Sequence, residues 1–335
     1  MKAIGFKTSQ EIENKESLIE FNIQKPKAKD FDIVIKVSAV SMNPVDTKVR
    51  ANAAKDIILD EPKILGYDAV GIVDEIGEHI TNFKIGDRVF YAGDVSKNGS
   101  NSQFQLIDSR IVALAPTSLK DDEAAALPLT SLTAWEAMFD RMNINKNDKK
   151  TILIIGGAGG VGSIATQIAK ESTNLTVIAT ASREETISWC KKMGADYVVN
   201  HKDLVNSVKN TGFETVDYIF NVANTEIHWD AMAELIAPQG KICSIVDAEI
   251  PVDINKLKSK SVTFIWEFMF TRPMFNTNDI EKQGEILSEI ATLVDGGKIK
   301  TTLSKTFQGF NVENIKDAHK LSESGKAIGK IAIQF

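Results

Sequence analysis

The stretch TILIIGGAGGVGSIATQIAK, residues 151–170, holds five glycines within seven positions, between two apolar runs. The run 151–155 predicts a buried strand, and the apolar residues after the turn recur at the spacing of one helix face. Gly157, Gly159 and Gly162 form the pattern G-x-G-x-x-G. Such a turn, directly after a strand and opening a helix, is typical of a site that binds the pyrophosphate of a dinucleotide.

Each glycine of this pattern has its own physical role. Gly157 allows the tight turn, Gly159 lets the backbone approach the pyrophosphate, and Gly162 lets the helix and the strand pack closely. The helix start at Gly160 and Val161 offers N–H groups and a positive dipole end to the phosphates. The alternative is a structural glycine-rich turn that binds no ligand.

The rest of the middle of the chain alternates in the same way. Strands are predicted over residues 175–180, 197–199, 216–221 and 241–246, and helices over 183–193 and 227–236. Continuous apolar strands alternating with helices predict a doubly wound parallel sheet of the Rossmann type, with helices on both faces. The loops after the later strands are expected to approach the nicotinamide, which makes Asn221 and Val246 candidate contacts.

The first third of the chain has a different texture. Residues 32–42, 69–77 and 86–93 predict short strands, and 95–104 predicts a polar hairpin-like tip. This spacing favours a compact β-rich domain over βαβ units. Further along, Pro128 is expected to break an Ala-rich helical stretch, with a helix resuming near Thr133. The closing residues KIAIQF read as a strand.

Length and composition limit the functional classes. The chain has 335 residues, which favours two domains, and its net charge of −6 disfavours nucleic acid as a partner. The two cysteines, Cys190 and Cys243, imply no disulfide framework. We find neither a signal peptide at the start nor an apolar run long enough to span a bilayer. The expectation is a cytoplasmic protein without a membrane partner.

The end of the second strand bears on the identity of the dinucleotide. An NAD site usually carries Asp or Glu there, whereas this chain has Ser182 and Arg183. A hydroxyl, a guanidinium and a helix start suit a 2′-phosphate, so NADPH is the predicted cofactor. Ser182 and Glu185 also fit a capping box, which would stabilise the helix whatever binds. His201 could face the same phosphate or lie exposed on its loop.

With these features in place, the chain resembles the medium-chain dehydrogenase/reductase superfamily. Within that superfamily it resembles the quinone oxidoreductase branch and the bacterial zinc-type alcohol dehydrogenase-like proteins. The segments that carry the resemblance are SMNPVDTK (41–48), LGYDAVGIV (65–73), GDRV (86–89), AAALPLTSLTAWEAM (124–138), GGAGGVG (156–162) and FIWEFMFTRPMF (264–275).

The resemblance implies a fold and an assembly. A GroES-like catalytic domain would span residues 1–127 and be completed by 267–335, around a Rossmann NADP(H)-binding domain over 128–266. It also implies a cleft between the two domains, and commonly a homodimer.

The chain departs from the zinc enzymes of that superfamily at their ligand positions. Those enzymes place a Cys where this chain has Asn43, and His-Glu where it has Tyr67-Asp68. Zinc prefers thiolate and imidazole ligands, and the four histidines here share no ligand spacing. Cys190 and Cys243 are expected to be buried packing residues. The prediction is a zinc-free protein.

Without a metal, alcohol oxidation is disfavoured, because zinc normally acidifies the hydroxyl. Hydride transfer from NADPH to a quinone or an α,β-unsaturated carbonyl asks only for positioning, hydrogen-bond donors and a proton. The alternatives are a zinc-type alcohol dehydrogenase or carbonyl reductase acting on simple alcohols or aldehydes, and a non-catalytic NADPH-binding sensor or structural protein.

Three residues are candidates for the reacting end of this site, following the resemblance. Asn43 could lie beside the nicotinamide or substrate, or only order the turn before Pro44. Tyr67 could donate to the substrate oxygen or form a wall of the cleft. Thr130 could contact the nicotinamide or cap the helix expected near Thr133.

Overall fold

The glycine turn joins β9 (Thr151–Ile155) to α4 (Gly160–Ser172) in the computed structural model, which describes all residues 1–335. β9 lies inside a six-stranded sheet of order β11-β10-β9-β12-β13-β14. Its other strands are β10 (Thr176–Thr180), β11 (Tyr197–Val199), β12 (Val216–Asn221), β13 (Ile236–Ser244) and β14 (Thr263–Trp266). Every neighbouring pair is parallel, as predicted for the doubly wound fold.

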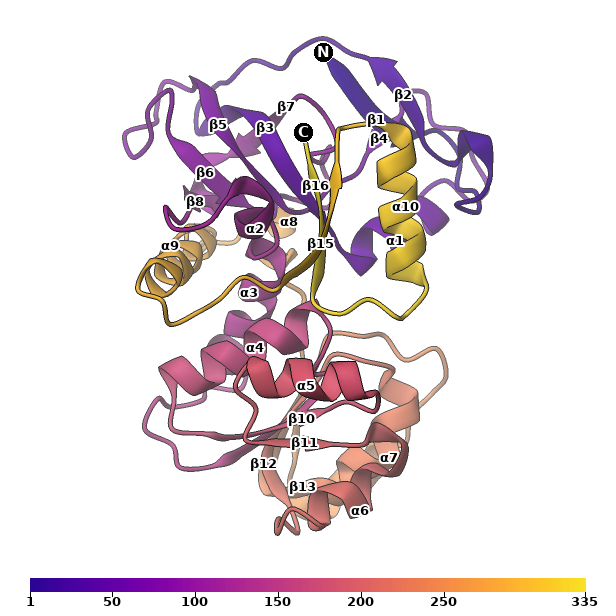
Figure 1. Cartoon of the computed structure of the whole chain (residues 1–335), viewed down its shortest axis with the longest axis vertical. Coiled ribbons are helices and arrows are strands. Elements are labelled where there is room, and N and C mark those ends of the chain that lie inside the picture. Colours follow the sequence, from indigo (N-terminus) through magenta and orange to yellow (C-terminus); the bar gives the residue numbers. More distant parts are fainter. The chain divides into compact units, whose positions relative to one another are not determined.

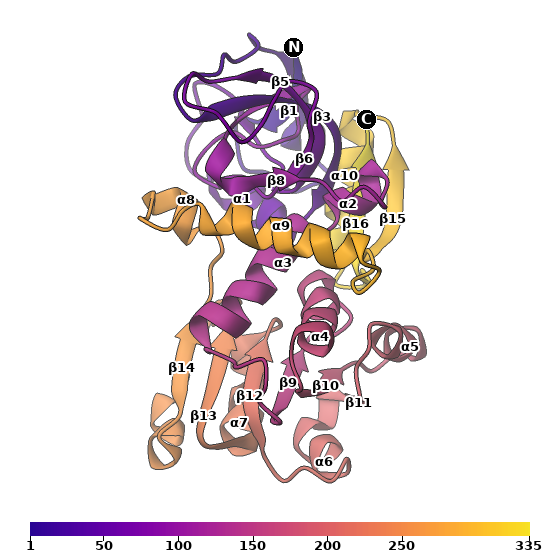
Figure 2. The same ribbon diagram turned by 90° about the vertical axis from the view of Figure 1, so that its left-hand side faces the viewer.

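The order of this sheet reverses between β9 and β12, so its helices cover both faces. They are α4, α5 (Glu184–Lys192), α6 (Leu204–Lys209) and α7 (Thr225–Leu235), with short 3-10 helices at His201–Asp203 and Ile254–Lys260. A buried core of Ile, Leu, Val and Met side chains, with Trp229, packs α6, α7 and the Ile254–Lys260 helix on the sheet. Figure 2 shows the strands fanned out from β14 to β11. The carboxyl ends of the strands therefore share one edge.

The β-rich part of the chain forms two sheets. A three-stranded sheet has the order β2-β1-β4, and a seven-stranded sheet runs β15-β16-β3-β5-β6-β8, with β7 paired to β3. The strands are β1 (Lys2–Phe6), β2 (Ile19–Asn22), β3 (Asp32–Met42), β4 (Lys63–Ile64), β5 (Ala69–Ile76), β6 (Arg88–Tyr91), β7 (Phe104–Asp108), β8 (Val112–Leu114), β15 (Leu303–Gln308) and β16 (Lys330–Gln334). The helices are α1 (Pro44–Asn52), α2 (Asp121–Ala125), α8 (Thr271–Phe275), α9 (Lys282–Asp295) and α10 (Val312–Glu323), with 3-10 turns at Lys15–Ser17 and Ser109–Ile111.

The two ends of the chain build this β-rich unit together. β16, near the C-terminus, pairs antiparallel with β3, so Ile331 lies opposite Met42. Figure 1 shows yellow β15, β16 and α10 beside the indigo and purple strands of the first hundred residues. The chain divides into residues 1–129 with 270–335, and residues 130–269.

The structure corrects two sequence-based boundaries. The helix expected to resume near Thr133 begins at Pro128 as α3 (Pro128–Trp135). Proline suits the first helical position, because the N–H that it lacks would have no partner there. β13 begins at Ile236 rather than at residue 241, and its pairing with β12 shifts register around the Pro238 turn.

α3 continues into a π-helix, η3 (Glu136–Arg141), which no sequence pattern had indicated. None of the helices of the chain has the length and apolar character needed to cross a bilayer.

Candidate functional site

The three glycines of the turn differ in what surrounds them. A Cβ on Gly157 would lie 2.8 Å from the Cβ of Ala179, and one on Gly162 would lie 2.3 Å from the carbonyl oxygen of Gly156. A Cβ on Gly159 would meet nothing nearer than that same oxygen, at 3.6 Å. Packing therefore requires the first and third glycines, whereas the space beside Gly159 is open.

The start of α4 lies next to that space. Gly159 is the N-cap residue, and no side chain caps the helix. Gly160 and Val161 in the first turn are half-buried. The first N–H groups of a helix have no partner within it, so here they are available to a phosphate. The turn fits the pyrophosphate of a dinucleotide both in space and in hydrogen-bond donors.

Ser182 and Arg183 follow β10 at the same sheet edge, with Ser182 half-buried and Arg183 exposed. The predicted capping box of Ser182 and Glu185 is wrong. Arg183 is the N-cap, and its N–H donates to Thr186 Oγ1 at 3.1 Å, while that hydroxyl donates back to the Arg183 carbonyl at 2.8 Å. The Arg183 Nε lies 3.1 Å from Glu185 Oε1. Both side chains are exposed, so the guanidinium can exchange this carboxylate for a phosphate.

His201 lies two residues after the end of β11 and is half-buried in its 3-10 turn. Its ring lies edge-on to that of His228 in α7, with 6.2 Å between the ring centroids. Burial lowers the pKa of His228, and the nearby His201 lowers it further. A second imidazole that the sequence analysis had not named therefore lies beside the first.

Asn221 and Val246 are brought together where β12 and β13 end. The Asn221 Nδ2 donates to Thr225 Oγ1 at 3.0 Å and to Ser244 Oγ at 3.1 Å, and the Thr225 hydroxyl contacts the Val246 carbonyl. Asn221, Thr225 and Ser244 are buried. The sequence analysis missed Thr225 and Ser244, because hydroxyl residues at strand and helix ends are common and carry no signal of their own.

Asn43 lies in a buried polar cluster of the β-rich unit. Its Nδ2 donates to Asp68 Oδ2 at 2.7 Å and to the Tyr67 carbonyl at 3.2 Å. Its Oδ1 accepts from the ammonium of Lys330, and its backbone N–H donates to Asp46 at 2.9 Å. Both side-chain N–H groups of Asn43 thus have acceptors inside its own domain. Its backbone N–H also helps to order the start of α1, which was the alternative role considered for this residue.

Asp68 accepts hydrogen bonds from four residues, which come from three parts of the chain. The Lys330 Nζ lies 2.9 Å from its Oδ2, which also accepts from Ser41 at 3.0 Å, and the N–H of Leu129 donates to its Oδ1 at 2.7 Å. Burial raises the pKa of Asp68, and the Lys330 ammonium with these hydrogen bonds opposes that rise. Lys330 escaped the sequence analysis because its partner lies 262 residues away.

Tyr67 stands beside this cluster, fully buried, with its ring edge-on to Phe270 at 5.5 Å between centroids. Its hydroxyl has no hydrogen-bond partner within the protein. Burial raises the pKa of this hydroxyl, and the charges of Asp46 and Asp94 add to the rise. Tyr67 therefore stays protonated, and it is a buried donor in need of an acceptor.

Thr130 is buried in the first turn of α3. Because the helix starts at Pro128, Thr130 cannot be the N-cap of a helix beginning near Thr133, and that alternative role is wrong.

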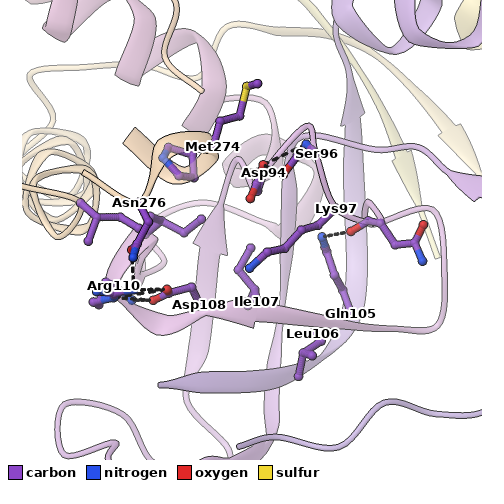
Figure 3. Close-up of a pocket in the computed structure, with 14 residues that line it drawn as sticks. Asp94, Ser96, Lys97, Gln105, Leu106, Ile107, Asp108, Arg110, Met274 and Asn276 are labelled. Atoms are coloured by element: carbon purple, nitrogen blue, oxygen red, sulfur yellow. Dashed lines mark hydrogen bonds and ion pairs between the residues drawn. The ribbon is translucent and has the colours of Figure 1, made fainter. Parts of the chain in front are cut away.

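A cavity of about 380 Å³ lies in the β-rich unit and was not foreseen (Figure 3). Its lining combines apolar side chains such as Ile107 and Met274 with charged ones such as Asp94, Lys97 and Arg110. Arg110 is held by Asp108 at 2.7 Å. This volume suits a small molecule.

The residues at the positions of the zinc ligands do not fit zinc. Asn43 offers an amide, and Asp68 is already paired with an ammonium. No group of three His, Cys, Asp or Glu side chains in the chain could hold a metal ion. Cys190 and Cys243 are both buried and free, which confirms their predicted place in the packing.

Comparison with known proteins identifies the family of this chain. The alcohol dehydrogenase GroES-like domain matches residues 29–113, and the zinc-binding dehydrogenase family matches residues 193–333. A zinc-type alcohol dehydrogenase-like protein of Staphylococcus epidermidis is 46% identical over 340 residues, covering 100% of both chains. A crystal structure from Rhizobium etli, described as a zinc-dependent alcohol dehydrogenase protein, has a TM-score of 0.96 and 47% identity, covering 100% of this chain and 98% of that one.

A more distant relative carries a more specific name. The 2-methylene-furan-3-one reductase of Solanum lycopersicum is 27% identical over 94% of this chain and 74% of its own length.

Proposed function

Because this chain belongs to the medium-chain dehydrogenase/reductase superfamily, alongside the zinc-type alcohol dehydrogenase-like proteins, and is thus an oxidoreductase, we propose that it reduces quinones or α,β-unsaturated carbonyls with NADPH and without zinc. The observation that carries the proposal is the space at Gly159, which packing does not explain and a pyrophosphate does. The distant relative named a 2-methylene-furan-3-one reductase supports an enone as the acceptor.

The protein's own part in this reaction is binding, orientation and a hydrogen bond. The reduced dinucleotide, when bound, supplies the hydride. The α4 start at Gly160 and Val161 would hold the pyrophosphate, and Ser182, Arg183 and His201 would face the 2′-phosphate. Asn221, Val246 and Thr130 remain the proposed contacts around the nicotinamide.

We assign the hydrogen bond to the acceptor oxygen to Tyr67. A quinone or enone gains negative charge on its oxygen as hydride arrives, and a fixed donor in a dry site stabilises that charge. Tyr67 supports this role because its hydroxyl is buried, protonated and without a partner in the protein. Asn43, whose side-chain N–H groups are already used, is assigned the holding of the Tyr67 peptide.

Zinc independence has its own support. A catalytic zinc needs three protein ligands, mostly imidazole or thiolate, with one open position. In this chain the ammonium of Lys330 already neutralises Asp68, between Asn43 and the Met42 carbonyl. Metal analysis of purified protein tests the assignment: one tightly held zinc per chain would contradict it.

Two glycine variants test the cofactor site against plain packing. In Gly159→Ala the added methyl has room, so the melting temperature is expected to hold while the Kd for NADPH rises tenfold or more. In Gly162→Ala the methyl meets the Gly156 oxygen, so stability is expected to fall by roughly 1–3 kcal/mol. An unchanged NADPH affinity in Gly159→Ala would overturn the cofactor assignment.

An acceptor panel tests the reaction. We expect quinones and enones to oxidise NADPH in stopped-flow mixing, simple aldehydes to react much more slowly, and Tyr67→Phe to lower kcat at least tenfold. Preferred turnover of simple aldehydes or alcohols would favour the alcohol dehydrogenase alternative. Tight NADPH binding with no turnover of any acceptor would favour a sensor or structural protein.

A further inference from the structure

Lys330 brings a positive charge into the buried cluster around Asn43, and only 3% of this residue is exposed. Its ammonium has three donors, and the structure gives each an oxygen acceptor. These are the Met42 carbonyl at 2.7 Å, Asp68 Oδ2 at 2.9 Å and the amide oxygen of Asn43. A buried lysine with all three donors satisfied has a single orientation.

This arrangement fixes which way the Asn43 amide faces. The oxygen of the amide points at the ammonium, so the Nδ2 must point at Asp68 and at the Tyr67 carbonyl. With the amide reversed, its NH₂ group would face the ammonium, and its oxygen would face a carboxylate and a carbonyl. Lys330 therefore excludes the reversed amide by repulsion as well as by lost hydrogen bonds.

The Asn43 amide in turn holds the peptide that carries Tyr67. Its Nδ2 lies 3.2 Å from the Tyr67 carbonyl, and on the other side the Gly66 N–H donates to Asp46 at 2.9 Å. These two hydrogen bonds fix the backbone on both sides of the Tyr67 Cα. The placement of the Tyr67 hydroxyl follows from that backbone and from the Phe270 ring.

We propose that Lys330 is a positioning residue for the reduction, acting through the Asn43 amide to hold Tyr67 in its donating position. This inference rests on the proposed function of Tyr67. It also goes beyond that function, because it assigns a role to a residue at the far end of the chain that touches neither substrate nor cofactor.

The test compares three variants with the wild type. Lys330→Met removes the ammonium and leaves Asp68 without its counter-charge. The double variant Lys330→Met with Asp68→Asn removes both charges, and its new amide accepts either orientation of Asn43. Arg50→Met is the matched control, because Arg50 is equally buried in the β-rich unit and pairs with Glu323, outside the cluster.

We expect Lys330→Met to lower kcat at least tenfold with KM for NADPH within twofold of wild type, since the proposed cofactor residues belong to the 130–269 unit. The double variant is expected to recover the melting temperature but not kcat. Arg50→Met is expected to lose stability and keep kcat. Recovery of kcat in the double variant would mean that Lys330 only neutralises Asp68, and the proposal would be overturned.

A second readout needs no turnover. The chain has four tyrosines, so ring-labelled protein gives few NMR signals, and Tyr67→Phe identifies the one from Tyr67. We expect that signal to shift in Lys330→Met and in the double variant, and to stay in place in Arg50→Met. A Tyr67 signal unmoved by loss of Lys330 would overturn the inference even if every acceptor failed. A shifted signal in a protein without turnover would sustain it and reject only the proposed reaction.

Discussion

Arg183 is the exposed side chain on which the proposed preference for NADPH depends. Its guanidinium lies at the start of α5, where the second strand of the sheet ends, and its partner Glu185 is exposed as well. An exposed ion pair is worth little, whereas a guanidinium on a phosphate makes short, charge-assisted hydrogen bonds. The 2′-phosphate of NADPH is therefore expected to displace Glu185.

Replacing Arg183 with Ala should weaken NADPH binding about tenfold, or about 1.4 kcal/mol, and leave NADH binding unchanged. Glu185→Gln should strengthen NADPH binding, because it removes the carboxylate that competes with the phosphate for Arg183. Fluorescence titration of both coenzymes measures the two changes. Equal losses for NADPH and NADH in Arg183→Ala would remove the basis for the preference.

Among single residues, the sequence analysis could name those whose signal is local. The glycines of the turn and Ser182 next to Arg183 stand within one supersecondary unit, so spacing alone places them. Lys330 was out of reach, because its role arises from Asp68 far away in the chain. Asn43 could be named by its position but not interpreted, since the direction of its amide depends on that same lysine.

Two buried carboxyl groups, one in η3 and one just after β14, contact the same arginine. Glu136 and Glu267 are both buried, and Arg141 reaches Glu267 at 2.7 Å and Glu136 at 3.5 Å. Burial raises the pKa of Glu267 to about 8, and the neighbouring Glu136 adds to the rise. The two carboxyls share a hydrogen bond, which also favours the protonated form of Glu267.

The pair of buried carboxyl groups predicts a pH dependence of stability. A carboxyl with a raised pKa binds its proton more tightly in the folded state, so stability falls as pH rises from about 4.5 through about 8. Glu267→Gln keeps the hydrogen bonds and cannot lose a proton. Urea unfolding at pH 6 and pH 8.5 should show a smaller loss of unfolding free energy in this variant than in wild type. Equal losses would mean that Glu267 is already ionised at pH 6.

Secondary structure was predictable where the residue pattern within a single segment determines it. The strands 32–42 and 216–221 were placed to the residue, because their apolar runs end at polar turns. The start of α3 was misplaced because Pro128 was taken as a break rather than as a first helical residue. The π-helix η3 could not be foreseen, since no local pattern marks it, and Glu267, the partner of its Glu136 and Arg141, lies elsewhere in the chain.

At the scale of the whole molecule, the edge of the six-stranded sheet formed by β14 is open and carries exposed aromatic side chains. β14 pairs only with β13, and Trp266 and Phe268 beside it are about half exposed. An open apolar edge of this kind is a template for pairing with another chain. We propose that a second copy of the chain pairs here, which would form the homodimer expected from the resemblance.

Sedimentation measures this assembly directly. Wild type is expected to sediment as a dimer, and Trp266→Glu to shift the equilibrium toward monomer by placing a charge in the contact. Ile58→Glu is the control, because Ile58 is 76% exposed and belongs to the β-rich unit, whereas β14 belongs to the 130–269 unit. A monomeric wild type, or a dimer lost equally in both variants, would place the assembly elsewhere or remove it.

The doubly wound sheet could be derived from strand and helix alternation alone, because all of its strands lie in one continuous stretch of the chain, from β9 to β14. The β-rich unit could not, since its strands come from both ends of the chain. Only the family resemblance indicated that residues beyond 267 complete it, and the pairing of β16 with β3 is the contact that does so.

The pairing of β16 with β3 also determines the order in which the two units can fold during synthesis. The 130–269 segment emerges whole and can fold while the polypeptide is still being made, but the earlier β-rich segment must wait for β16. Until then Asp68 has no ammonium beside it, and Met42 has no strand opposite it. A messenger RNA that lacks its last few codons would therefore yield a chain whose 130–269 unit is folded and whose β-rich unit is incomplete. Such a chain would be open to proteolytic quality control.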